Sequence, residues 1–115
     1  DLERFDVPLS RAQARDKLGW PQDRKIIVAV RRLVRRMGID NLVEAIGRIV
    51  PHHPEVLVMI GGKGPLAEEL KAAISRKGLD DHVKLLGFIS NDDLPLAYRA
   101  ADMSVVPTVA LEGLA

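Results

Sequence analysis

The stretch KIIVAVRRLVRRMG, residues 25–38, decides the fold of this chain of 115 residues. Its first six residues form a branched apolar run that is typical of a strand buried in a parallel sheet. A basic segment with four arginines follows: Arg31, Arg32, Arg35 and Arg36. Gly38 then precedes a helical pattern. Ligands of open α/β sheets bind where strands end and helices begin, and helix N-termini favour anions. The stretch therefore predicts a binding site for a phosphorylated ligand, with a solvated basic loop as the alternative.

The composition restricts the class of protein. Hydrophobic residues make up 47% of the chain and aromatic residues only 3%, so aliphatic side chains must build the core, as in parallel sheets covered by helices. The net charge of +1 gives no overall attraction to nucleic acid or to an anionic membrane. The sequence contains no cysteine, which excludes disulfides and thiolate metal sites. The adjacent His52 and His53 have no third ligand near them in sequence, so we expect no metal site.

Residues 1–24 are interpreted as a connector, because they are polar and show no sustained periodicity. Ser10 is a good N-cap for a short helix over residues 11–18, and Gly19 would end that helix. We expect Phe5, Leu18 and Trp20 to rest on the body of the domain. The chain starts with Asp1 rather than Met, which is expected of an excised fragment.

The remaining sequence alternates between strand and helix patterns. We expect strands over residues 25–30, 56–60, 83–86 and 103–106, and helices over residues 40–50 (or from 38), 66–77 and 92–100. Pro65 suits the first turn of the second of these helices, and Asn91 suits the N-cap of the third. Ile49, Met59 and Met103 are expected to be buried.

Strands joined by such crossovers are parallel, with right-handed connections. Their carboxyl ends then share one edge of the sheet. That edge would carry the arginines, the glycine-rich residues 61–65, Gly87, Phe88 and Thr108. A tight turn alone could also explain the glycines, because short glycine motifs are weak signals.

Four blocks occur in a fixed order: RRLVRRMGID at 31–40, IGGKGPLAEEL at 60–70, VKLLGFISNDDLPLAYRAADMSVVPT at 83–108 and LEGL at 111–114. Together they resemble the C-terminal, donor-binding domain of the group 1 (family 4) glycosyltransferases. The resemblance implies an α/β fold with a Rossmann-like parallel sheet of about four βα units, the incomplete C-terminal half of a GT-B fold. Residues 1–24 would be the interdomain linker, and residues 25–115 a truncated Rossmann-like nucleotide-sugar-binding domain.

The resemblance also implies a function. Members are retaining transferases that move a sugar from a nucleoside diphosphate sugar to an acceptor. The sugar or lipid acceptor would bind the absent N-terminal domain, so this fragment alone should be inactive. We expect neither a metal nor another cofactor, and no nucleic-acid partner. The full-length protein would be cytoplasmic, with peripheral attachment at the inner face of the membrane as an alternative. Uncovered sheet edges predict self-association of the fragment.

Residue roles follow from the same resemblance. Arg32 matches the arginine that holds the donor diphosphate and would offset its charge as the leaving group departs. Arg35 or Arg36 would add charge, and Gly62 and Gly64 match the loop at the donor phosphates. A guanidinium can bind phosphate through two N–H groups, and each charge-assisted hydrogen bond contributes roughly 1.5–3 kcal/mol.

Three further positions complete the implied site. Phe88 and Ile89 fall where the family's main chain meets the nucleobase. Glu112 matches the first glutamate of the E-x7-E block, which would accept hydrogen bonds from the donor sugar and act in catalysis with Arg32. By itself, Glu112 is an ordinary surface carboxylate.

The chain also departs from the family pattern. Met37 stands where the family usually has a lysine, and Arg31 stands in place of a glycine. The second glutamate of the E-x7-E block would lie beyond Ala115, through either truncation or an internal deletion. These departures keep two alternatives open. One is a noncatalytic nucleotide- or phosphate-binding module. The other is an interaction module that binds an acidic partner or RNA through its arginines, although no aromatic platform lies among them.

Overall fold

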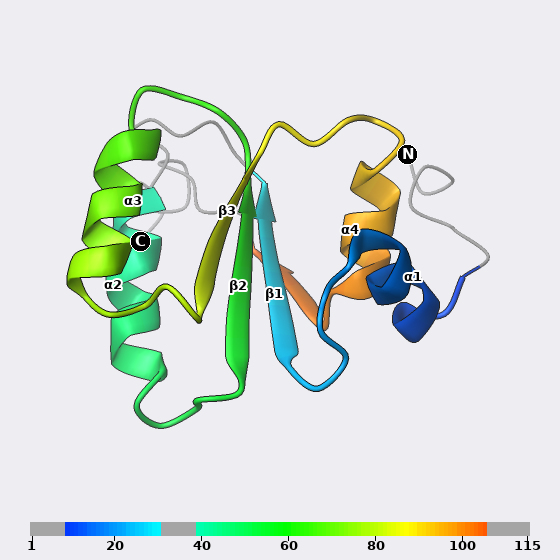
Figure 1. Cartoon of the computed structure of the whole chain (residues 1–115), viewed down its shortest axis with the longest axis horizontal. Coiled ribbons are helices and arrows are strands. Elements are labelled where there is room, and N and C mark those ends of the chain that lie inside the picture. Colours follow the sequence, from blue (N-terminus) through cyan, green and yellow to red (C-terminus); the bar gives the residue numbers. More distant parts are fainter. Residues whose placement is uncertain (1–8, 31–38, 106–115) are drawn as a thin grey trace, which may run out of the picture.

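The computed structural model describes residues 9–30 and 39–105 of the chain (Figure 1). Within them, a parallel sheet contains the strands β1 (Lys25–Val30), β2 (Val56–Gly61), β3 (Val83–Gly87) and β4 (Met103–Val105). The order across the sheet is β3-β2-β1-β4. The helices are α1 (Arg11–Leu18), α2 (Ile39–Ile49), α3 (Ala67–Arg76) and α4 (Leu94–Ala100). Helices α2 and α3 cover one face of the sheet, and α1 and α4 lie on the other (Figure 1).

The core has one hydrophobic cluster on each face of the sheet. All six residues of β2 are buried, and successive side chains point to opposite faces. Val58 and Ile60 pack with residues of α2 and α3, whereas Leu57 and Met59 pack with β1 and with the half-buried Trp20. Burying each aliphatic side chain contributes about 1.5–3 kcal/mol. The aliphatic composition thus supports a sheet that is covered on both sides.

Helix α1 forms as its capping residues predict. The Ser10 hydroxyl accepts a hydrogen bond from the Gln13 N–H at 3.1 Å, and the Gln13 side chain accepts one from the Ser10 N–H at 2.9 Å. Gly19 ends the helix with φ of 74°, in the left-handed region. Ala14 and Arg15 are buried in this helix. The connector therefore packs firmly onto the sheet domain over residues 9–24.

The helix starts differ from two of the predictions. Helix α4 begins at Leu94 rather than at residue 92, and Asn91 is not its N-cap. The Ser90 hydroxyl instead accepts a hydrogen bond from the Asp93 N–H at 3.2 Å, in the turn before the helix. Helix α3 begins at Ala67, so Pro65 lies in the preceding turn. In both cases, residues expected in the first helical turn belong to the loop.

Two apolar residues are more exposed than expected. Met103 is 58% exposed, because β4 pairs only with β1 in the described sheet and lies at its edge. Ile49 is 40% exposed at the last residue of α2. Met59 is buried, as predicted. Across the described ranges, no helix has the length and apolar character needed to cross a membrane.

Candidate functional site

Two glycine-containing loops meet at the carboxyl edge of the sheet. The N–H of Gly62, just after β2, donates a hydrogen bond to the carbonyl oxygen of Gly87, at the end of β3, over 2.7 Å. Both residues have positive φ, 134° for Gly62 and 75° for Gly87. Residues other than glycine rarely adopt such positive φ angles. These two glycines therefore allow the two loops to contact each other through main-chain atoms.

The side chain of Ile89 lies over Gly61. A Cβ on Gly61 would overlap Cδ1 of Ile89 and would lie 2.9 Å from its Cγ1. The same Cβ would be 3.6 Å from Cγ2 of Val30, the last residue of β1. The ends of β1 and β2 and the loop after β3 thus converge around one glycine. Phe88 is 71% exposed beside this point.

Four of the predicted donor-site residues lie in the described part: Gly62, Gly64, Phe88 and Ile89. The structure brings the loop of Gly62 together with the loop that carries Phe88 and Ile89. The other predicted residues lie outside the described ranges: Arg32, Arg35, Arg36, Thr108 and Glu112. The strands that lead to them are described, and Val30 pairs with Gly61 while Ala29 pairs with Val105. The described ends of β1 and β4 therefore lie at the same edge of the sheet as the glycine loops.

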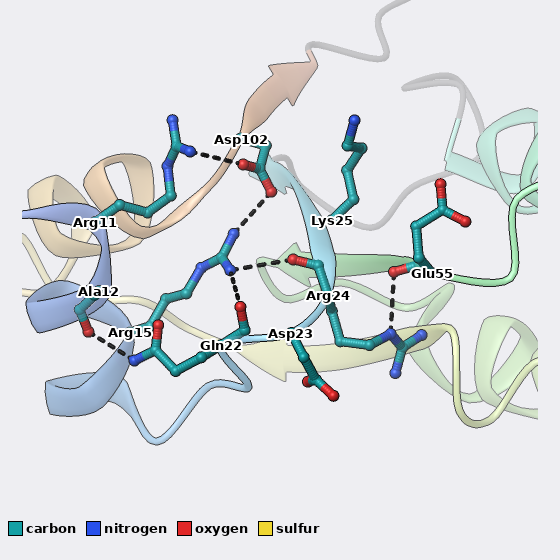
Figure 2. Close-up of a pocket in the computed structure, with 9 residues that line it drawn as sticks. All are labelled: Arg11, Ala12, Arg15, Gln22, Asp23, Arg24, Lys25, Glu55 and Asp102. Atoms are coloured by element: carbon teal, nitrogen blue, oxygen red, sulfur yellow. Dashed lines mark hydrogen bonds and ion pairs between the residues drawn. The ribbon is translucent and has the colours of Figure 1, made fainter.

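A second polar site lies at the opposite, amino edge of the sheet. There, an open hollow of about 560 Å³ is lined by charged residues of α1, of the turn before β1, and of the starts of the strands (Figure 2). The Arg15 guanidinium lies at its centre and its side chain is only 5% exposed. It forms an ion pair with Asp102, with 2.7 Å between Nη2 and Oδ2. Sequence analysis did not identify this pair.

Asp102 is held by three donors. Its carboxylate accepts hydrogen bonds from Arg15 and from the Ile26 N–H, the latter at 2.8 Å. Arg11 lies 2.9 Å from its other oxygen. Burial is the largest single influence on the Asp102 pKa and raises it, but the hydrogen bonds from Ile26 and Arg15 and the two arginine charges together outweigh burial. The pKa of Asp102 is therefore held below its ordinary value.

The sequence did contain a weak signal for this pair. Arg15 follows Ala14 on the inward face of the predicted helix, where an apolar residue would be expected. Asp102 immediately precedes a strand, where a carboxylate can accept a free N–H of the neighbouring strand. Neither signal identifies the partner residue, because the two residues are 87 positions apart in the sequence.

Comparison with known proteins identifies the class to which this fold and these loops belong. Residues 10–115 match the family model of the group 1 glycosyl transferases. The match covers most of the chain, so the chain belongs to the group 1 glycosyltransferase family. The resemblance found in the four sequence blocks is thereby confirmed.

Individual relatives make the relationship more specific. The chain is 34% identical over 108 residues to glycosyltransferase MJ1607 of Methanocaldococcus jannaschii, covering 91% of this chain and 27% of the relative. It is 33% identical over 108 residues to the GDP-mannose-dependent alpha-(1-6)-phosphatidylinositol monomannoside mannosyltransferase of Mycolicibacterium smegmatis, covering 93% and 28%. The chain thus spans little more than a quarter of the length of these curated relatives.

Solved structures agree with the fold. The Anabaena protein HepE, determined in complex with UDP, superposes with a TM-score of 0.75 and 25% identity, over 90% of this chain and 29% of HepE. The Rossmann-like parallel sheet predicted from the sequence is confirmed. The chain covers only part of each of these structural neighbours.

Proposed function

We propose that this chain is the donor-binding part of a retaining glycosyltransferase, which transfers a sugar from a nucleoside diphosphate sugar to an acceptor. One observation carries the proposal. The Gly62 loop and the loop of Phe88 and Ile89 meet at the carboxyl edge, beside the end of β1. This is the edge at which open α/β sheets bind ligands. Residues 25–115 would form the nucleotide-sugar-binding domain, and residues 1–24 the interdomain linker.

Arginines and glycines would bind the diphosphate of the donor. Arg32, with Arg35 or Arg36, would neutralise the diphosphate and stabilise it as it leaves. Gly62 and Gly64 would let the main chain approach the phosphates closely. A relative whose name specifies GDP-mannose and a structural neighbour solved with UDP support a nucleoside diphosphate as the ligand. No metal or other cofactor has a role in this proposal.

The nucleobase and the sugar would lie on either side of the diphosphate. The main chain at Phe88 and Ile89 would contact the base, and the 71% exposure of Phe88 leaves its ring accessible to a ligand. Glu112 would bind the sugar and act with Arg32 in catalysis, and Thr108 would be a further donor-binding residue.

Nucleotide titration tests the proposal directly. The chain and its Arg32→Ala variant are titrated with UDP and with GDP by calorimetry. Loss of a bidentate phosphate contact should weaken binding of at least one nucleotide by about tenfold, or about 1.4 kcal/mol. Arg76→Ala is the matched control, because Arg76 is an exposed arginine in the last turn of α3. Equal affinities for the chain and for Arg32→Ala would exclude the proposed role of Arg32.

The acceptor would bind another domain, so the 115-residue chain should bind donor without transferring sugar. Glycosyltransfer sites lie in clefts, which commonly form between domains. We also propose that the chain associates with itself through its uncovered apolar surfaces. A cytoplasmic location, with peripheral attachment to the inner face of the membrane as the alternative, belongs to the same proposal.

A noncatalytic nucleotide- or phosphate-binding module is the second candidate function. Met37 in place of the expected lysine, together with Arg31 in place of a glycine, favours it, because methionine cannot bind phosphate as a cation. Sugar transfer by a full-length protein that contains this chain would exclude this candidate. Tight, salt-sensitive RNA binding without nucleotide binding would instead favour an interaction module.

A further inference from the structure

Asp102 and Ile26 are joined by a reciprocal pair of hydrogen bonds at the amino ends of β1 and β4. The Asp102 N–H donates to the Ile26 carbonyl oxygen at 2.8 Å. The Ile26 N–H donates to the Asp102 carboxylate, also at 2.8 Å. Immediately beyond this pair, Ile27 is in register with Met103. The Asp102 side chain therefore sets the point at which β4 begins to pair with β1.

Arg15 connects the same carboxylate to three main-chain carbonyl groups. Its Nη2 donates to the Asp102 carboxylate at 2.7 Å, and its Nε donates to the carbonyl oxygen of Ala100, the last residue of α4, at 2.8 Å. Its Nη1 donates to the carbonyl oxygens of Gln22 and Arg24, in the turn before β1. Figure 2 shows the guanidinium between the Asp102 carboxylate and the carbonyl oxygens of Gln22 and Arg24. One side chain of α1 thus holds the end of α4 and the beginnings of both strands.

The chemistry of this contact favours a role in positioning. A buried ion pair is often no more stabilising than well-packed apolar residues of similar volume. A fully satisfied polar network instead restricts a core to one arrangement, because any shift would leave a buried group unpaired. Arg15 is 4% exposed, so a slip of β4 would leave a buried cation without its carboxylate. Apolar packing alone would not impose this energetic cost on a shifted β4.

Strands β1 and β4 connect the Arg15–Asp102 contact with the carboxyl edge of the sheet. Strand β1 has six residues, so its ends are roughly 20 Å apart at about 3.3 Å per residue. The residue after β1 is Arg31, and the segment after β4 leads to Thr108. Both segments belong to the proposed donor site. A change in the pairing of β1 with β4 would move the described ends of the two strands, Val30 and Val105, relative to each other.

We propose that Arg15 and Asp102 are positioning residues for donor binding. They fix helix α1 to the β1–β4 pair and thereby set the relative placement of the carboxyl ends of these strands, Val30 and Val105. This inference rests on the proposed function, because it concerns the same donor site. It adds that the linker helix α1 moves as one body with the donor-binding domain.

Asp102→Asn is the test variant. The amide keeps the shape and retains one acceptor oxygen, but it removes the charge and leaves one of the donors Arg15, Arg11 or Ile26 N–H without its acceptor. Asp23→Asn is the matched control, because Asp23 is exposed and lines the same hollow without an ion pair among the described residues. Circular dichroism first establishes conditions under which both variants are fully folded. Affinities for UDP and GDP are then measured, together with backbone amide chemical shifts.

The proposal expects Asp102→Asn to weaken nucleotide binding by about fivefold or more, and Asp23→Asn to change it by less than about twofold. Amide resonances of Gly62 and Val105 should shift in the first variant only. Arg15→Lys separates charge from geometry. A lysine keeps the charge, but its compact ammonium cannot reproduce the planar fork. Its nucleotide affinity should therefore fall as in Asp102→Asn.

The outcomes are distinguishable. If the unmodified chain binds neither UDP nor GDP, the proposed function fails and the inference falls with it. If the chain binds nucleotide and folded Asp102→Asn binds it equally well, the positioning role is overturned and the proposed function stands. Should Asp102→Asn fail to fold, Arg15→Lys carries the test, because a lysine keeps the charge but cannot reproduce the fork of hydrogen bonds. A weakening of about fivefold or more in folded Arg15→Lys supports positioning, and unchanged binding and shifts overturn it.

Discussion

The side chain of Ile89 lies directly over Gly61, so the loop after β3 closes against the end of β2. No Cβ fits between them without displacing Ile89. This contact joins two segments of the proposed donor site. It also makes Gly61 sensitive to the smallest substitution.

Gly61→Ala should destabilise the chain by about 1–3 kcal/mol, as overpacking of a well-packed core does. The added methyl group would overlap Cδ1 of Ile89 and displace the loop that carries Phe88. Urea unfolding followed by circular dichroism measures the change. The double variant Gly61→Ala with Ile89→Ala should lose less stability than the sum of the two single variants, because the shorter side chain leaves room for the methyl group. Strict additivity would contradict the contact.

Gly47→Ala should act in the opposite direction. Gly47 lies within α2, and an added Cβ would be 3.8 Å from Cδ1 of Leu79, an ordinary contact distance. Alanine reduces the conformational freedom of the unfolded chain and should stabilise the protein by about 0.5–1 kcal/mol. The same urea experiment tests this substitution. A loss of stability would show that α2 has no room for the methyl group.

Arg15→Ala should be much more damaging than Arg11→Ala, although both arginines form an ion pair with Asp102. The Arg15 side chain is 5% exposed and the Arg11 side chain 56%. Removing one partner of a buried pair costs about 3–5 kcal/mol, whereas an exposed pair contributes about 0–1 kcal/mol. Thermal and urea unfolding of the two variants give the comparison. Similar losses would show that burial does not set the strength of these contacts.

Acid should remove the contribution of Asp102 to the free energy of unfolding. The pKa of this carboxyl is lower in the folded chain than the ordinary value of 3.8. The charged form therefore stabilises the fold above the ordinary value, and this contribution declines as the pH falls through the folded pKa. The difference in unfolding free energy between the chain and Asp102→Asn should be constant near neutral pH and shrink below about pH 4. A difference that stays constant down to about pH 2 would contradict the lowered pKa.

Met103→Lys should reduce the proposed self-association. Met103 is 58% exposed on β4, which lies at the edge of the described sheet. Exposed edge strands pair with other chains, and lysine on an edge opposes this pairing. Sedimentation velocity over a range of concentrations should show larger species for the unmodified chain than for the variant. A monomeric unmodified chain at high concentration would exclude the association.

Most of the fold could be predicted from local pattern. The apolar run of β1, the alternation with helices, the capping by Ser10 and the stop at Gly19 depend on neighbouring residues, and the structure confirms each of them. The differences lie in the exposure of Ile49 and Met103 and at helix starts, where Ser90 rather than Asn91 provides the contact. Several side chains compete for such a position, and local sequence does not rank them.

The candidate site, too, could be predicted only in part from the sequence. The sequence predicts that the proposed donor site lies at the carboxyl edge, because parallel strands put their ends together and glycines permit the loops there. The contact of Ile89 with Gly61 and the pairing of Arg15 with Asp102 depended on the tertiary structure. These pairs link distant positions, 87 residues apart in the second case. Periodicity and capping act over a few residues, whereas only the folded chain determines which distant groups meet.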